Sequence, residues 1–503
     1  MRPPAPIPDG YVPRMPEQTD LHRLVSAWWP SFHERSEEAG GLPQFVVKTF
    51  EHYLRCGILR HGFVRVSCPT CRDDLLVAWS CRRRGLCPSC SGRRMADTAA
   101  HLVDRVLPDV PVRQWVLTLP FRLRAKVAFD SALSAAVRTL FVTTVCDAYR
   151  ARAARLGLSG SDTGAVTVTQ RFGSALNLNP HFHSLLLDGV YHRPTPDGPL
   201  VFAPHSRLTD AMVDSVLTTF RFRLDRLLRR RGYGAEAEDL PEPQPCALTQ
   251  LSLSALRAGG RPSRDGPESE SGGPKWPRPR VQRGRRARPR KPLCAAQAGF
   301  TLHAATAVPA GKRGDLEVLC RYILRPAVTQ DRVVWRQDDT VEWTLSRPWS
   351  DGTTRLIFQP LAFLARLAVL IPRPYVNDTA YHGVLAPAAR WRPEVVAQAT
   401  GGVRRPRRPC DDRQPTSPLP EEPASTVRPR HLDWAGLLWR SFATDVLTCT
   451  TCGDRRKVLA LVQDPHSIQA ILRHLGLTPS AGAPPTTRPR APPQGSLDLS
   501  PTT

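Results

Sequence analysis

The amino-acid sequence predicts a protein of the α+β class, in which a small cysteine-rich unit precedes a larger domain of helices and strands. Residues 21–110 hold six of the 13 cysteines, including two Cys-x-x-Cys pairs. From residue 113 onward, short stretches rich in Val, Leu, Thr and aromatic residues alternate with long amphipathic stretches. Two short stretches follow each other across a loop that contains Gly, Asn and Pro, which predicts a β-hairpin.

Residue patterns and end signals predict the individual helices and strands. The helix 130–157 has Asp130 as its N-cap and Gly157 as its stop, and the helix 208–232 is capped near Thr209. The other expected elements are strands at 113–120, 164–172 and 181–190, strand-like residues at 339–360, and helices at 95–108, 315–326 and 361–372.

Segments rich in Pro, Gly, Ser and Arg divide the chain, because such compositions offer little apolar surface to bury. The expected parts are a disordered N-terminus at 1–20, a cysteine-rich domain at 21–110, a main domain at 111–400 with a low-complexity insertion at 234–296, a linker at 401–430, a small C-terminal unit at 431–477 and a disordered tail at 478–503.

The charge of the chain indicates a polyanionic partner. A formal net charge of +25 arises from 70 Lys and Arg residues, most of them Arg, against 45 Asp and Glu residues. Guanidinium groups suit phosphate, so nucleic acid is the leading partner class and an anionic membrane the weaker one. A GC-rich genome would also raise the Arg content, so composition identifies no chemistry.

Neither a membrane span nor a signal peptide is expected. The sequence has no uninterrupted run of about 18 apolar residues, and its N-terminus has no apolar core. We therefore expect a cytoplasmic protein that does not bind membranes. Thiols stay reduced in the cytosol, so 13 cysteines favour metal binding over disulfides.

The two Cys-x-x-Cys pairs of the first domain predict a structural zinc site. Two such pairs supply the four thiolates that surround Zn²⁺ in a zinc ribbon. An unmetallated redox pair is the weaker alternative. The remaining cysteines of this region, Cys56 and Cys81, are interpreted as buried free thiols. The predicted zinc ligands are Cys68, Cys71, Cys87 and Cys90.

An incomplete cysteine pair lies near the C-terminus. Cys449 and Cys452 supply half of a metal site, and His466, His474 or Cys410 would have to complete it. Nothing in the spacing decides between these three, so a second metal is not predicted.

Arginines beside the second pair of the first domain predict a surface for DNA phosphates. They are Arg82, Arg83, Arg84, Arg93 and Arg94.

In the stretch NLNPHFHSLLLDGV, residues 177–190, two histidines stand on either side of a phenylalanine at the start of an apolar run. Residues two apart in a strand face the same side, so His181 and His183 would face together. Polar residues at the end of a surface strand are the alternative interpretation. As a metal site, the pair would take Gln170 of the preceding strand as a weak third ligand. Such an open site suits Mg²⁺ or Mn²⁺, or zinc, acting as a Lewis acid on a phosphate.

The helix 315–326 offers a nucleophile for this site. Its apolar residues recur at the spacing of one buried helical face, and Tyr322 lies beside that stripe. Arg321 and Arg325 flank Tyr322 and would bind phosphate. A boundary residue with a packed ring and an exposed hydroxyl is the alternative interpretation.

In this order, these motifs resemble the insertion-sequence ninety-one family of HUH rolling-circle transposases and the related common-region elements. The resemblance spans roughly residues 20–477 apart from the insertion. It rests on the cysteine unit and on the stretches WVLTLP, QRFGSALNLNPHFHSLLLDGVY, LCRYILRP, RPWSDGTTRLIFQP and YHGVLAPAARWRPEVV.

The resemblance implies an HUH endonuclease core, an antiparallel sheet with packed helices that carries the histidine pair, preceded by a zinc-ribbon domain that contacts DNA. It implies that His181 and His183 bind Mg²⁺ or Mn²⁺. It also implies that Tyr322 nicks single-stranded DNA at element ends and target through a 5′-phosphotyrosine.

One position departs from the founding members, which have two tyrosines four residues apart on this helix. Here Val318 stands four residues before Tyr322, so the chain resembles the single-tyrosine branch. No GxxxxGK[ST] motif occurs, so unwinding would depend on a host helicase or replication machinery, and we expect a bacterial, nucleoid-associated protein. A rolling-circle replication initiator and a non-catalytic zinc-ribbon DNA-binding protein stay open as alternatives.

Overall fold

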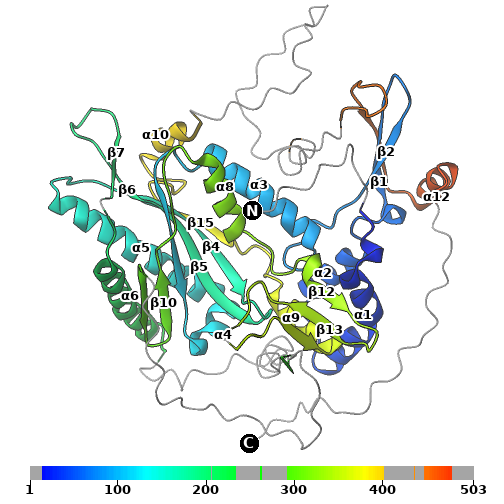
Figure 1. Cartoon of the computed structure of the whole chain (residues 1–503), viewed down its shortest axis with the longest axis horizontal. Coiled ribbons are helices and arrows are strands. Elements are labelled where there is room, and N and C mark those ends of the chain that lie inside the picture. Colours follow the sequence, from blue (N-terminus) through cyan, green and yellow to red (C-terminus); the bar gives the residue numbers. More distant parts are fainter. Residues whose placement is uncertain are drawn as a thin grey trace, which may run out of the picture.

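The computed structural model describes residues 14–205, 207–233, 261–262, 292–349, 351–400, 436 and 447–477. The predicted linker 401–430 and tail 478–503 lie outside the described residues, as do most of the predicted N-terminus 1–20 and of the insertion 234–296. The described part combines helices and sheets in an α+β arrangement, as predicted (Figure 1).

A seven-stranded sheet forms the centre of the protein (Figure 1). Its strand order is β15 (Thr379–Gly383), β4 (Gly164–Phe172), β5 (Leu178–Leu187), β3 (Val112–Thr118), β10 (Phe300–His303) and β9 (Cys294–Gln297), with β11 (Ala307–Val308) also paired to β3. Strands β4 and β5 pair antiparallel, which confirms the predicted hairpin. Strand β9 begins inside the segment predicted as an insertion, because its pairing with β10 gives it a place at the sheet edge.

Alternation along β3 and β5 divides the two faces of the sheet. Trp115, Leu117 and Phe182 are fully buried on one face. Leu185 and the two histidines lie on the other face. The first face is covered by α4 (Phe121–Phe129), α5 (Ser131–Arg155) and α6 (Asp210–Arg230), and the second by α3 (Pro88–Arg105) and α8 (Arg313–Ile323).

Two helices begin where the sequence predicts, because side chains cap their first turns. Asp130 accepts a hydrogen bond from the Leu133 amide at 2.9 Å, and Thr209 accepts one from the Met212 amide at 3.3 Å. Gly157 ends α5 with a positive φ of 81°, a conformation that glycine adopts without strain.

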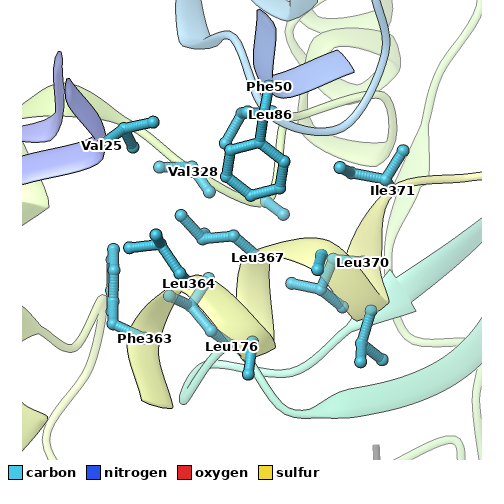
Figure 2. Close-up of a cluster of buried hydrophobic side chains, with 14 of the residues drawn as sticks. Val25, Phe50, Leu86, Leu176, Val328, Phe363, Leu364, Leu367, Leu370 and Ile371 are labelled. Atoms are coloured by element: carbon cyan, nitrogen blue, oxygen red, sulfur yellow. The ribbon is translucent and has the colours of Figure 1, made fainter. Parts of the chain in front are cut away.

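The N-terminal helices share a hydrophobic core with the second half of the chain. Helices α1 (Asp20–Glu38) and α2 (Gln44–Leu54) pack with α9 (Pro360–Leu370) and a four-stranded sheet. Figure 2 shows Phe50 of α2 above Leu367 of α9. The segments on either side of the predicted boundary at residue 110 therefore pack together. The sheet order is β12 (Val333–Trp335), β13 (Val341–Thr344), β14 (Arg355–Phe358) and β8 (Arg261–Pro262).

A small three-stranded sheet joins the N-terminal unit to the C-terminal segment. Strand β1 (Phe63–Ser67) lies between β2 (Asp74–Ala78) and β16 (Lys457–Val462), and α12 (Pro465–His474) packs beside it (Figure 1). The remaining elements are β6 (Gly189–His192), β7 (Val201–Pro204), α10 (Arg392–Ala397) and the 3₁₀ turns η1 (Pro16–Gln18), η2 (Leu59–His61), η3 (Gln330–Arg332) and η4 (Gln398–Thr400). Among the residues described, no single helix is long and apolar enough to cross a membrane, and α4 and α5 meet that test only as a pair bent by 117°.

Candidate active site and cysteine groups

The two histidines lie side by side on β5 and face α8. Their ring centroids are 4.9 Å apart, and His183 is only 3% exposed. In the sheet register, His181 stands directly opposite Gln170 of β4. Opposite residues of an antiparallel pair share one face. The structure thus brings the three predicted ligand residues together.

The hydrogen bonds of these side chains leave ligand atoms without a partner. His181 Nδ1 lies 2.7 Å from the carbonyl oxygen of Asn179, so Nδ1 carries the proton and Nε2 keeps its lone pair. His183 Nε2 and Gln170 Oε1 are buried and have no hydrogen-bond partner among the described residues. Burial of such atoms is costly unless something binds them. Imidazole nitrogens with an amide oxygen suit a divalent ion, so these residues fit the predicted metal.

Gln114 of β3 is a hydrogen-bond partner of His183 Nδ1. Its amide nitrogen lies 2.8 Å from His183 Nδ1, and Gln114 is 5% exposed. A half-turn of the amide exchanges its oxygen and nitrogen. With the oxygen facing Nδ1, that ring nitrogen donates, and Nε2 is free to bind a metal. A lone glutamine in an apolar strand carries no sequence signal, and only the register between β3 and β5 places it beside His183.

Burial lowers the pKa of both histidines. The pKa of His183 lies well below its ordinary value because the ring is buried, and the charges of His181 and Arg325 add to the effect. Burial also lowers the pKa of His181, with smaller contributions from Arg325 and Arg124. Both imidazoles are therefore neutral near neutral pH, which is the state that ligates a metal.

Tyr322 projects from α8 beside the histidine pair. Its ring centroid is 6.0 Å from that of His183, and Tyr322 is 42% exposed. The guanidinium of Arg325 lies 4.6 Å from the centre of the Tyr322 ring. Gln170 Nε2 donates to the Ile323 carbonyl at 2.6 Å, which attaches the end of α8 to β4. The backbone of Tyr322 is therefore held in place, and its side chain is exposed enough for a large substrate to reach it.

Among the described residues, eight cysteines form two groups of four, and the predicted single set is wrong. The sulfur atoms of each group lie within 4.8 Å of one another. The β1–β2 hairpin explains the grouping: Cys68 and Cys71 occupy its turn, whereas Cys56 and Cys81 flank its base, near the start of α3. The first cysteine group is Cys56, Cys81, Cys87 and Cys90, and the second cysteine group is Cys68, Cys71, Cys449 and Cys452.

The first cysteine group has the geometry of a closed zinc site. The Cys56 sulfur lies 3.7 Å from that of Cys87 and 3.6 Å from that of Cys90, and the Cys81 and Cys90 sulfurs are 3.4 Å apart. Zinc–sulfur bonds of about 2.3 Å in a tetrahedron place sulfur atoms about 3.8 Å apart. Cys56 and Cys81, interpreted from the sequence as spare thiols, complete this group.

Several of the arginines predicted to bind DNA form hydrogen bonds or ion pairs within the protein. Arg84 donates to Asp378 at 3.0 Å and to the Val376 carbonyl at 2.8 Å, and Arg321 pairs with Glu317 at 2.7 Å. Arg93 also donates to the Ser80 hydroxyl at 3.2 Å, and an Arg83 nitrogen lies 3.2 Å from His52 Nε2. Contact with DNA stays a prediction for the whole set. The set is Arg82, Arg83, Arg84, Arg93, Arg94, Arg321 and Arg325.

Two family models match the chain. Residues 164–392 match a family described as "Putative transposase", and residues 24–119 match one described as "Transposase zinc-binding domain". The first match contains β4, β5 and α8, and the second contains the whole first cysteine group. No curated protein and no solved structure matches the chain.

Proposed function

The chain belongs to the insertion-sequence ninety-one family of transposases, and from this premise we propose that it nicks and rejoins single-stranded DNA through a covalent tyrosine–phosphate bond. The central sheet with its helices acts as an HUH endonuclease core. The DNA substrates are the ends of the mobile element and its target, and transposition follows a rolling-circle route.

The convergence of candidate ligands and a candidate nucleophile on one face of the sheet supports this proposal. His181 and His183 come from β5, Gln170 comes from β4, and Tyr322 comes from α8. Within the part of the chain that the structure describes, two buried ligand atoms in this set have no hydrogen-bond partner. A packed structural cluster would satisfy those atoms, whereas a Mg²⁺ or Mn²⁺ site needs them unpaired.

A divalent ion bound by His181, His183 and Gln170 would act as a Lewis acid on the scissile phosphate. Tyr322 attacks the phosphorus through its phenolic oxygen, and the bond from phosphorus to the 3′-oxygen breaks. The phenol loses its proton and the 3′-oxygen gains one, so the products are a 3′-hydroxyl and a 5′-phosphotyrosine. Attack by a 3′-hydroxyl on that phosphotyrosine reverses the step and rejoins the strand.

Two further residues of this region, Arg325 and Val318, bear on how DNA binds and on how many strands are attached at once. Arg325 lies over the Tyr322 ring, where its charge restrains the phenol and attracts a DNA phosphate. Val318 is 67% exposed one turn before Tyr322, at the position where the founding members have a second tyrosine. The active site therefore holds one covalent DNA strand at a time.

Covalent capture of DNA tests the proposal. The full chain is incubated with labelled single-stranded DNA from the element ends and Mn²⁺, and the adduct is resolved by denaturing electrophoresis. Tyr322→Phe should abolish the adduct while DNA binding persists, because only a half-exposed hydroxyl is lost. His181→Ala combined with His183→Ala should also abolish it. Tyr375→Phe is the matched control, since Tyr375 is fully exposed on another part of the chain.

An adduct of wild-type yield in Tyr322→Phe, mapped to Tyr375 or Tyr381, would overturn the assignment of the nucleophile. Specific DNA binding without an adduct in the wild-type protein would favour the non-catalytic alternative.

A further inference from the structure

The second cysteine group joins two segments that lie far apart in the sequence. Cys68 and Cys71 lie in the turn of the β1–β2 hairpin, and Cys449 and Cys452 come just before β16. The Cys68 and Cys452 sulfurs are 3.4 Å apart, as are the Cys71 and Cys449 sulfurs. The zinc-binding family match ends at residue 119, so it contains only half of this group.

The two halves of the group have the same backbone conformation. The Cys68 amide donates to the Asp73 carbonyl at 2.9 Å, and the Cys449 amide donates to the Asp454 carbonyl at 2.8 Å. The Arg72 amide returns to the Cys68 carbonyl at 2.9 Å, and the Gly453 amide returns to the Cys449 carbonyl at 3.0 Å. Arg72 and Gly453, each four residues after the first cysteine of its pair, both have positive φ, at 59° and 75°. Each pair is thus a turn that presents two thiolates to one point.

The sulfur positions favour a metal over disulfides. A disulfide requires two sulfurs about 2.05 Å apart, whereas four thiolates around zinc stay about 3.8 Å apart. The four sulfurs here are mutually close, with none isolated as a bonded pair. We propose that the second cysteine group binds a second structural zinc ion, and that this zinc fastens the C-terminal segment 447–477 to the N-terminal unit.

Contacts around the group show what the zinc would hold in place. Strand β16 pairs antiparallel with β1, and the buried Arg456 forms an ion pair with the partly exposed Asp73. The apolar core between the two segments is small and consists of Phe63, Leu76, Val462, Ile468 and Leu472. So small a core stabilises a fold weakly, and natural proteins of this size add a metal or disulfides. The C-terminal segment therefore depends on the metal for its attachment.

Zinc content and protease sensitivity of the full chain test this proposal. Elemental analysis should find one zinc for each of the two groups, and Cys449→Ser combined with Cys452→Ser should remove one of them. The same variant should expose segment 447–477 to limited proteolysis. Cys56→Ser combined with Cys81→Ser is the matched control, because it should remove the other zinc and leave segment 447–477 protected. Unchanged zinc in Cys449→Ser/Cys452→Ser, or disulfides in the wild-type protein detected by mass spectrometry without reductant, would overturn the proposal.

Zinc release from the wild-type protein gives a second measurement that needs no variant to fold. Cys71 and Cys452 lie at the surface, whereas Cys56, Cys87 and Cys90 are buried. A chelator should therefore remove the zinc of the second cysteine group first, and cleavage in segment 447–477 should rise with that fast phase. Release of both ions in a single slow phase, with the segment still protected when half of the zinc has gone, would contradict the assignment.

Discussion

Gln114 offers a sensitive test of the proposed metal site, because it touches a ligand without being one. We predict that Gln114→Met raises the Mn²⁺ concentration needed for adduct formation and leaves the maximum yield near that of the wild type. Methionine has a similar length and no hydrogen-bonding group, so the variant removes the bond to His183 Nδ1 and keeps the volume. Gln114→Glu should preserve the Mn²⁺ requirement, since a carboxylate accepts the Nδ1 proton in either orientation.

The structure sets the size of this effect. Gln114 is 5% exposed and His183 is 3% exposed, so water does not replace the lost 2.8 Å hydrogen bond. Loss of such a partner of a ligating histidine weakens metal binding about 10- to 100-fold. That range corresponds to about 1.4–2.8 kcal/mol. We expect the upper part of it, because Gln114 is the hydrogen-bond partner that fixes the tautomer of the His183 ring in the described structure.

The assay is a Mn²⁺ titration of adduct yield with single-stranded element-end DNA, run beside a thermal melt without metal. The melt should show only a small loss of stability, because one buried hydrogen bond contributes about 1 kcal/mol to the free energy of unfolding. A half-saturating Mn²⁺ concentration equal to that of the wild type in Gln114→Met would refute the reasoning, and so would a loss of yield that excess Mn²⁺ does not restore.

Three further predictions concern other parts of the protein. Arg82→Gln should make the log–log dependence of single-stranded DNA affinity on salt shallower by about 0.7 in fluorescence anisotropy, if Arg82 binds one phosphate. Leu367→Ala, in the core of Figure 2, should lower the free energy of unfolding by about 2–5 kcal/mol in urea. Burial lowers the pKa of His382 to about 4, so below about pH 6.5 the unfolded chain takes up a proton that the folded chain does not. Stability should fall by up to about 3 kcal/mol toward pH 4, and His382→Gln should reduce that fall in pH-dependent melts.

Local features of the sequence account for most of what could be predicted. The His-x-His spacing places His181 and His183 on one face because strand residues alternate, and Asp130 and Thr209 fix helix starts through their own side chains. Strand β4 has the predicted bounds, since a β-branched run between Gly164 and the loop after Phe172 leaves little alternative. These signals act over a few residues and need no knowledge of the rest of the chain.

Long-range partners could not be predicted. Pairing by proximity joined Cys68 and Cys71 to the next Cys-x-x-Cys pair, whereas Cys68 meets Cys452 across 384 positions. The β1–β2 hairpin, whose turn carries the first pair, is not among the predicted elements. Helix α9 shows the same limit: its apolar residues predict a helix, but nothing local predicts that it packs with α1 and α2. Such pairings depend on the topology of the whole fold, and the spacing of motifs along the sequence does not predict that topology.

The β4–β5 hairpin connects the first cysteine group to the candidate active site. Its loop inserts Leu176 into an apolar core (Figure 2). The same core contains Cys56, Cys87 and Cys90 of this cysteine group. The Ser174 carbonyl in the same loop accepts a hydrogen bond from the Trp343 indole at 2.8 Å. Only a few residues farther along the two strands, the register sets Gln170 opposite His181. Loss of metal from the first cysteine group would loosen the core that holds the loop, and with it the register that assembles the ligands. Under the proposed function, we therefore predict that a variant without that metal loses adduct formation even where it still binds DNA.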